Sequence, residues 1–165
     1  MRENRHPAGE VESYVPSLRR YARGLIGREA FDPAGCAEDM VREVVERARG
    51  RGQLGAFRDP RLWLYATLTA RNRARSAAAS LAQAPARPRA PGAADGLGRL
   101  DLEDREALLL VVVEGFNYAQ AASILGLSRH GVASRVARAR AQLSGAAQAQ
   151  AAPRLRHPPY LRLVK

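Results

Sequence analysis

The stretch that decides the fold runs from Asn117 to Leu143 and reads NYAQAASILGLSRHGVASRVARARAQL. Asn117 followed three positions later by Gln120 predicts the capped start of a short helix. Gly126 predicts a tight turn after it, and Ser128 predicts the cap of a second helix. The apolar residues of that second helix recur in steps of four, three and four, at Val132, Val136, Ala139 and Leu143. Two helices joined by a short glycine turn predict a helix-turn-helix.

The second helix of this motif is basic and has no acidic residue. Its arginines are Arg129, Arg135, Arg138 and Arg140. This charge favours DNA binding over a purely structural helical hairpin, which the same turn and cap would also suit. Because the first turns of such a helix enter the major groove, we expect Arg129, His130 and Ser134 to face base edges. Farther along the helix, we expect Arg135 and Arg138 to contact phosphates, although each arginine could also be solvated or held in a local ion pair.

The charge of the whole chain indicates a polyanion or an acidic protein as partner. The 165 residues carry a net charge of +11, and all 27 basic residues except Lys165 are arginine. Residues 101–128 hold one basic and five acidic side chains, whereas residues 129–165 hold eight basic and none acidic. Such a change from an acidic to a basic segment is typical of a module whose charges are separated by sign. A general preference for arginine and alanine in the genome is the alternative explanation of the excess.

Several classes of protein are excluded by composition. No stretch approaches the roughly 18 apolar residues of a transmembrane helix, and residues 1–10 lack an apolar signal core, so we expect a cytoplasmic protein without membrane insertion. One cysteine excludes a disulfide framework or a multi-thiolate site, and the three histidines lie far apart, so we expect no metal. Paired carboxylates, nucleophile motifs and phosphate-binding glycine loops are missing from the sequence. We therefore expect no catalytic residues, no cofactor and no enzyme activity.

The remaining chain predicts an all-α protein with two small domains. Residues 10–80 have helical periodicity in three segments, two of which begin with Asp-Pro, a cap followed by a first-turn proline. Residues 81–98 are rich in Pro, Ala and Gly and predict a flexible linker between modules that fold independently. Residues 99–145 form the helix-turn-helix domain. Residues 146–165 form a basic tail for which we expect disorder.

Both domains resemble those of bacterial extracytoplasmic-function (ECF) sigma factors. Leu100–Leu143 resembles sigma region 4 in its acidic first helix, its Val-Glu-Gly turn, its Y-x-x-A-A-x-x-L-G pattern and its final S-R-x-x-R-A-R. The first domain is similar to sigma region 2 in YVPSLRRYARGL, AEDMVREVVERA and LWLYATLTARNRAR. The resemblance implies an initiation factor that binds core RNA polymerase through region 2 and promoter DNA through both regions. It also implies control by an anti-sigma factor.

The same resemblance suggests roles for residues of the first domain. Asp39, Arg42 and Glu43 would contact polymerase, and Arg71, Asn72, Arg73 and Arg75 would contact the nontemplate strand. Arg42 replaces a glutamine that is usual in the family, and the recognition helix lacks the usual Thr and Lys. These departures keep two alternatives open. One is a sigma-like decoy that binds an anti-sigma factor without transcribing, and the other is a regulator that uses only its helix-turn-helix.

Overall fold

The computed structural model describes residues 7–26, 33–50, 59–82 and 96–151, and every regular element in these ranges is helical. This agrees with the all-α fold expected from the sequence. The elements are α1 (Pro7–Ile26), α2 (Pro33–Gly50), α3 (Pro60–Ala82), the 3-10 helix η2 (Leu97–Arg99), α4 (Leu102–Leu108), the π-helix η3 (Leu109–Val113), α5 (Tyr118–Leu125) and α6 (Arg129–Ala151).

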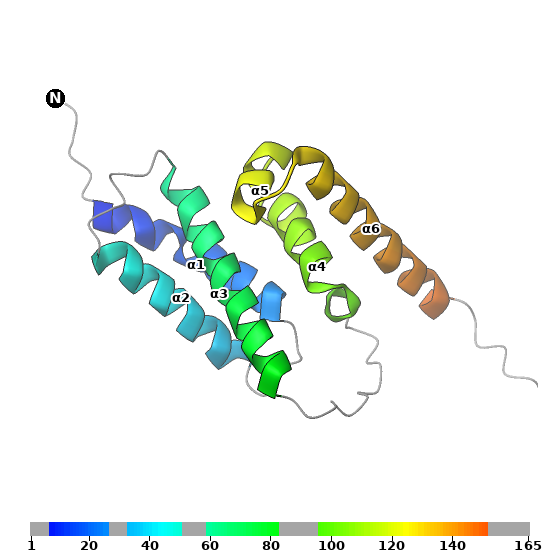
Figure 1. Cartoon of the computed structure of the whole chain (residues 1–165), viewed down its shortest axis with the longest axis horizontal. Helices are drawn as coiled ribbons and strands as arrows, with labels where there is room; N and C mark the ends of the chain where they lie inside the picture. The colour runs from blue at the N-terminus through cyan, green and yellow to red at the C-terminus, as the bar shows by residue number, and fades with distance from the viewer. Residues whose placement is uncertain (1–6, 27–32, 51–58, 83–95, 152–165) are drawn as a thin grey trace, which may run out of the picture.

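The first module is a three-helix bundle of α1, α2 and α3 (Figure 1). The apolar stripes seen in the sequence form its interior, where Leu18, Tyr21, Val44, Leu64 and Leu68 are almost completely buried. The backbone N–H of Leu62 donates to Asp59 Oδ1 at 3.2 Å, which confirms the capped start expected for α3. The equivalent cap expected at Asp32 lies outside the described residues.

The second module packs α4, with its continuation η3, against α5 and α6. At the start of α5, Asn117 Oδ1 accepts from Gln120 N at 2.9 Å and Gln120 Oε1 accepts from Asn117 N at 3.1 Å. The expected capping box is therefore confirmed. Gly126 ends α5 with φ of 69°, a left-handed conformation that favours glycine, and thereby makes the turn of the helix-turn-helix.

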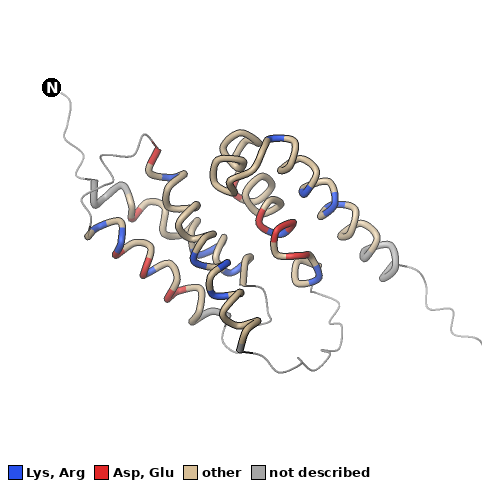
Figure 2. The backbone as a smooth tube through the Cα atoms, in the orientation of Figure 1, with Lys and Arg blue, Asp and Glu red and all other residues tan. Residues whose placement is uncertain are grey.

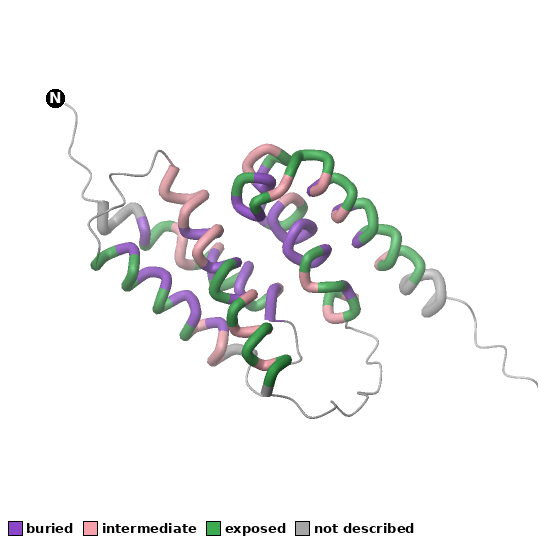
Figure 3. Tube along the Cα trace, in the orientation of Figure 1, coloured by how far each residue is buried: buried purple, intermediate pink, exposed green. Residues whose placement is uncertain are grey.

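The two modules lie side by side and share one apolar core (Figures 1 and 3). The α3 helix runs beside α5, and α1 runs beside η3 and α4. Leu109 packs so closely on α1 that a Cβ added to Gly24 would lie 2.9 Å from its methyl groups. This packing was not expected from the linker composition, which predicts modules that fold independently.

The helix ends differ by a few residues from the domain boundaries expected from the sequence, and the expected tail begins inside α6. The α3 helix continues to Ala82, η2 begins at Leu97, and α6 continues past residue 145 to Ala151. The rest of the expected linker, residues 83–95, and the rest of the expected tail, residues 152–165, lie outside the described residues.

Candidate nucleic-acid interface

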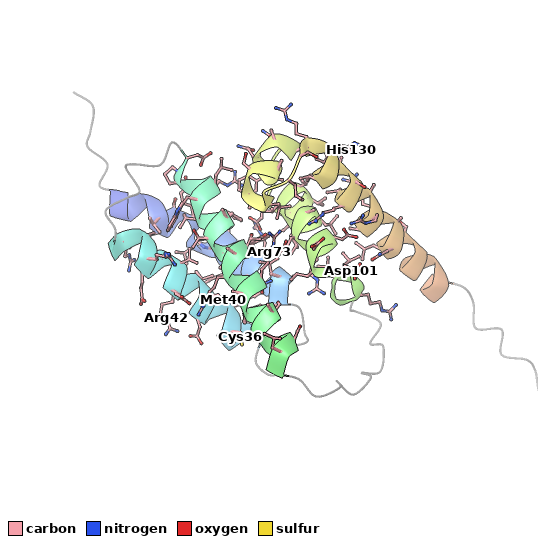
Figure 4. All side chains as sticks on the ribbon, viewed as in Figure 1. Cys36, Met40, Arg42, Arg73, Asp101 and His130 are labelled. Carbon is pink, nitrogen blue, oxygen red and sulfur yellow. The ribbon has the colours of Figure 1, made fainter. Side chains whose placement is uncertain are left out.

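The first turns of α6 present an exposed basic surface. Ser128 caps this helix by accepting from the backbone N–H of Gly131 at 3.1 Å, and Arg129, His130 and Ser134 are all exposed. His130 lies at the start of α6, at the edge of the molecule (Figure 4). Arg129 and His130 border a shallow hollow between the N-terminal ends of α5 and α6, which Asn117 and Tyr118 also line. The surface has the exposure and charge that a major-groove reader needs.

The two arginines farther along α6 are held by acidic residues of the second module. Arg138 donates to both carboxylate oxygens of Asp104, at 2.6 and 3.0 Å, and Arg135 pairs with Glu103 at 2.6 Å. Hydrogen bonds to Asp104 raise the pKa of Arg138, so this guanidinium stays charged. Asp104 is buried, whereas the Arg138 side chain is more than half exposed and can still face a phosphate.

The four candidate residues on α3 differ greatly in exposure. Arg71 is exposed and pairs with Glu43 of α2 at 2.8 Å. Asn72 is completely buried. Arg73 donates to both oxygens of Glu106 at 2.6 to 3.1 Å, and in Figure 4 it lies between α3 and α4. Arg75 is partly buried and donates to Asn72 Oδ1 at 3.3 Å. Of the four, only Arg71 is exposed, and its side chain is about half accessible beside its partner Glu43.

The candidate polymerase-binding residues lie together on the outer side of α2. Arg42 pairs with Asp39 one turn away at 2.8 Å, and both side chains are about two-thirds exposed. Figure 4 shows Arg42 projecting away from the second module. Glu43 pairs across to Arg71 and so connects this surface with α3. Beside that pair runs a groove between α2 and α3, which half-buried Trp63 lines together with Arg47.

The charged residues at the junction of the modules were not singled out by sequence reasoning. Glu114 accepts from Arg20 of α1 at 2.9 Å through each of its oxygens and from the Tyr65 hydroxyl of α3 at 2.6 Å. Arg61 of α3 donates to the Glu114 carbonyl and places its guanidinium 4.0 Å from the Phe116 ring centroid. Burial and the Glu114 carboxylate raise the pKa of Tyr65, so its hydroxyl remains a hydrogen-bond donor.

Two further contacts join α4 to the first module. Arg105 is buried and donates to the carbonyl of Leu25 at 3.0 Å, as well as to carbonyls of its own module. The Glu106 carboxylate, which is 0% exposed, pairs with Arg73. Figure 2 shows the acidic residues of α4 between the basic residues of α3 and α6. A signal for Glu106 exists in the sequence, because it lies four residues from both Leu102 and Leu110 and thus on an apolar stripe.

Neither a metal-binding cluster nor a membrane-spanning helix occurs in the part of the chain that the structure describes. No three or more His, Cys, Asp or Glu side chains in these ranges are grouped so that they could hold a metal ion. Among the described helices, none is both long and apolar enough to cross a membrane.

Comparison with known proteins connects both modules to sigma factors. The family described as "Sigma-70, region 4" matches residues 94–143, and the family described as "Sigma2 domain of PhyR" matches residues 11–69. The ECF RNA polymerase sigma factor EcfG of Rhodopseudomonas palustris (strain TIE-1) is 32% identical over 154 residues, which cover 82% of this chain and 81% of EcfG. The chain belongs to the ECF sigma factor family. RNA polymerase sigma factor CnrH of Cupriavidus metallidurans is 45% identical over a shorter segment of 51 residues, 31% of this chain and 27% of CnrH.

Solved structures of sigma factors and their relatives share the arrangement of this ECF chain. The sigma factor RpoE of Bartonella quintana, in complex with the anti-sigma factor NepR, superimposes with a TM-score of 0.64 at 26% identity, covering 85% of this chain and 95% of RpoE. The PhyRSL–NepR complex from Sphingomonas sp. Fr1 superimposes with a TM-score of 0.63 at 26% identity, covering 94% and 98%. The chain thus resembles a sigma factor and a PhyR domain about equally in fold.

Proposed function

We propose that the chain is a sigma subunit that directs RNA polymerase to promoters, acts in the cytoplasm and is controlled by an anti-sigma factor. The observation that carries this proposal is the exposed start of α6, where Arg129, His130 and Ser134 are open to a DNA groove. The full-length similarity to EcfG supports it. The role is binding and positioning rather than catalysis, because the polymerase supplies the chemistry.

In this proposal the two modules bind different parts of the promoter. Region 4 reads the −35 element through the start of α6, where an arginine can donate to a guanine edge, while Arg135 and Arg138 face phosphates. Region 2 binds the melted −10 strand through Arg71, Asn72, Arg73 and Arg75. The Asp39, Arg42 and Glu43 surface of α2 binds core polymerase. Its mixed charges suit a polar protein interface better than a polyanion.

The test is co-elution of the purified chain with core RNA polymerase on gel filtration, followed by run-off transcription from genomic fragments. Reversing charge by Asp39→Arg should abolish co-elution. Glu12→Arg is the matched control, because it also removes an exposed carboxylate that pairs with a surface arginine, in this case Arg49. Equal loss in both variants would contradict the assignment of the α2 surface. Failure of the unmodified chain to co-elute would contradict the proposed function.

A decoy that sequesters an anti-sigma factor is the second candidate. It is favoured by the match of residues 11–69 to the Sigma2 domain of PhyR, since PhyRSL itself forms a complex with NepR. Co-elution and run-off transcription separate the two candidates. Tight binding to an anti-sigma factor without binding to polymerase would favour the decoy, whereas transcripts that disappear in Arg129→Ala would favour the sigma factor.

A further inference from the structure

A row of exposed side chains runs along α6 from its first turn. His130, Ser134 and Arg138 follow one another at intervals of four residues, so they lie on the same side of the helix in successive turns. All three are exposed. The proposed function places His130 and Ser134 against base edges, and Arg138 comes one turn after them. The Arg138 side chain is therefore placed to meet the DNA backbone beside the bases that are read.

The Arg138 guanidinium is held from inside the module by Asp104 of α4. Arg138 Nε donates to Asp104 Oδ2 at 3.0 Å, and Arg138 Nη2 donates to Asp104 Oδ1 at 2.6 Å. Two parallel bonds of this kind fix the plane and the direction of a guanidinium, and they leave its remaining N–H groups free of the carboxylate. The Asp104 side chain is 1% exposed and the Arg138 side chain is 57% exposed, so the bonded edge lies inside and the other edge faces outward.

The neighbouring arginine of α6 shows that pairing with α4 does not by itself present a cation to solvent. Arg135 pairs with Glu103 at 2.6 Å, but here the exposures are reversed, at 17% for the Arg135 side chain and 64% for Glu103. Arg135 lies beside Val136, which belongs to the buried stripe of α6. Of the two ion pairs, only that of Asp104 has the carboxylate behind the guanidinium and the guanidinium outside.

We propose that Asp104 is a positioning residue for DNA binding, which holds the Arg138 guanidinium in the orientation that contacts a backbone phosphate next to the bases read by α6. This inference rests on the proposed function for the identity of the ligand. A long arginine side chain ordinarily loses rotational freedom when it binds, and the grip of Asp104 removes much of that loss in advance. Asp104 also brings a negative charge close to the phosphate, so charge alone predicts that DNA binding improves when Asp104 is neutralised.

The first pair of variants sets positioning against charge. Asp104→Asn keeps the size of the side chain but turns an amide N–H toward one of the two guanidinium N–H groups, so the bidentate grip is lost. Asp101→Asn is the matched control, because Asp101 is exposed at the start of the same helix and its side chain makes no capping hydrogen bond. On charge alone, both variants bind DNA more tightly than the parent. Positioning instead predicts that Asp104→Asn binds about threefold to tenfold more weakly than Asp101→Asn.

The second pair of variants leaves the net charge unchanged. Arg138→Lys keeps a cation beside Asp104, but an ammonium group cannot form the two parallel bonds of a guanidinium. Arg140→Lys is the matched control, since Arg140 is exposed two residues farther along the same helix. Both variants should fold, because each keeps a long basic side chain in place. On charge alone the two lysine variants bind DNA equally, whereas positioning predicts weaker binding by Arg138→Lys.

The measurement is fluorescence anisotropy of a labelled DNA duplex, the one that the full parent chain enriches most strongly from a random-sequence pool. Titrations at several salt concentrations give Kd and the slope of log K against log salt. Arg138→Ala should lower that slope by about one unit, as expected for one lost phosphate contact. In the Arg138→Ala background, Asp104→Asn should bind at least as tightly as Arg138→Ala alone, because no guanidinium remains to be positioned. This double-mutant cycle separates positioning from a general effect of Asp104 on the fold.

The inference is overturned if Asp104→Asn binds as tightly as Asp101→Asn, or if its weaker binding persists in the Arg138→Ala background. Should Asp104→Asn fail to fold, as detected by circular dichroism, the lysine pair decides, and equal Kd values for Arg138→Lys and Arg140→Lys overturn the inference. The proposed function fails in a different way. If Asp104 and Arg138 are coupled in DNA binding but the parent chain does not co-elute with core polymerase, the positioning role stands and the sigma role does not.

Discussion

Glu114 is a carboxylate enclosed between the modules, and its oxygens accept hydrogen bonds from two different helices of the first bundle. Its side chain is 1% exposed, while its partner Arg20 remains 56% exposed. Burying a carboxylate in this way is costly unless its oxygens accept hydrogen bonds. The Tyr65 hydroxyl contributes the shortest of these bonds, and its ring packs edge-on against Phe116 at a centroid distance of 4.8 Å.

Replacing Tyr65 by Phe should therefore weaken the junction without disturbing its shape. The variant keeps the ring contact but removes one donor to a buried carboxylate, so we expect the free energy of unfolding to fall by about 1–3 kcal/mol. Urea denaturation followed by circular dichroism measures the change. Tyr14→Phe is the control, because Tyr14 is only partly buried. Equal stability of parent and Tyr65→Phe would show that the hydroxyl contributes nothing.

Arg138 and Arg140 separate a structural from a DNA-binding role on α6. Arg138→Ala leaves the buried Asp104 carboxylate without its bidentate donor, so we expect the variant to unfold at a lower urea concentration than the parent. Arg140 is exposed, and its replacement should change stability by less than about 0.5 kcal/mol. Measuring the salt dependence of DNA binding for both variants shows whether Arg138 also neutralises a phosphate. In that case the slope of log K against log salt falls by about one unit.

The α4 helix is unusual among the elements because it places carboxylates where an apolar residue would be expected. Glu106 lies inside the stripe that faces α3, and burial raises its pKa despite the opposing hydrogen bonds from Arg73. When the pKa of a carboxyl group is higher in the folded protein than in the unfolded chain, the protonated form of the group stabilises the folded state. Its contribution to stability is therefore lost as the pH rises from below its unfolded pKa through its raised folded value.

This linkage predicts the pH dependence of a Glu106→Gln variant. The free energy of unfolding of the parent minus that of the variant should be larger at about pH 4 than at pH 7. Only the parent has a carboxyl group at position 106, and the protonated form that favours folding is lost over that interval. Denaturant titrations of both proteins at each pH provide the difference and cancel the other titrating groups. A difference that stays constant, or one that grows in favour of the parent at pH 7, would show that folding does not raise the Glu106 pKa.

At the level of elements, the helix starts were predictable and the junction was not. The caps at Asp59, Asn117 and Ser128 depend on neighbours within four residues, so the local sequence specifies them. The π-helical end of α4 is closed by long-step backbone hydrogen bonds, in which Glu114 N donates to Leu109 O and Phe116 N donates to Leu110 O. The pairing of Arg73 with Glu106 joins residues 33 positions apart. No local pattern determines such a contact.

The whole molecule behaves as two modules held together by one core, and this has a measurable consequence. If a protease site is inserted between residues 83 and 95 and then cleaved, we expect the two fragments to stay associated on gel filtration at micromolar concentration. The reason is that aromatic, apolar and ionic contacts join them without the linker. The same cleavage in Gly24→Gln should release separate fragments. Separation of the parental fragments would show that the linker alone keeps the modules together.

The composition of the junction also bears on how the chain emerges from the ribosome. The first module is complete once Ala82 has been made, whereas its partners Glu114 and Phe116 are synthesised later. Until then the exposed face of α3 presents Tyr65 between Arg61 and Arg73, a mixture of ring and cation that water solvates well. A nascent bundle with this surface resists self-association in a way that a purely aliphatic face would not. We therefore expect the nascent first module to aggregate less than a bundle whose open face was aliphatic.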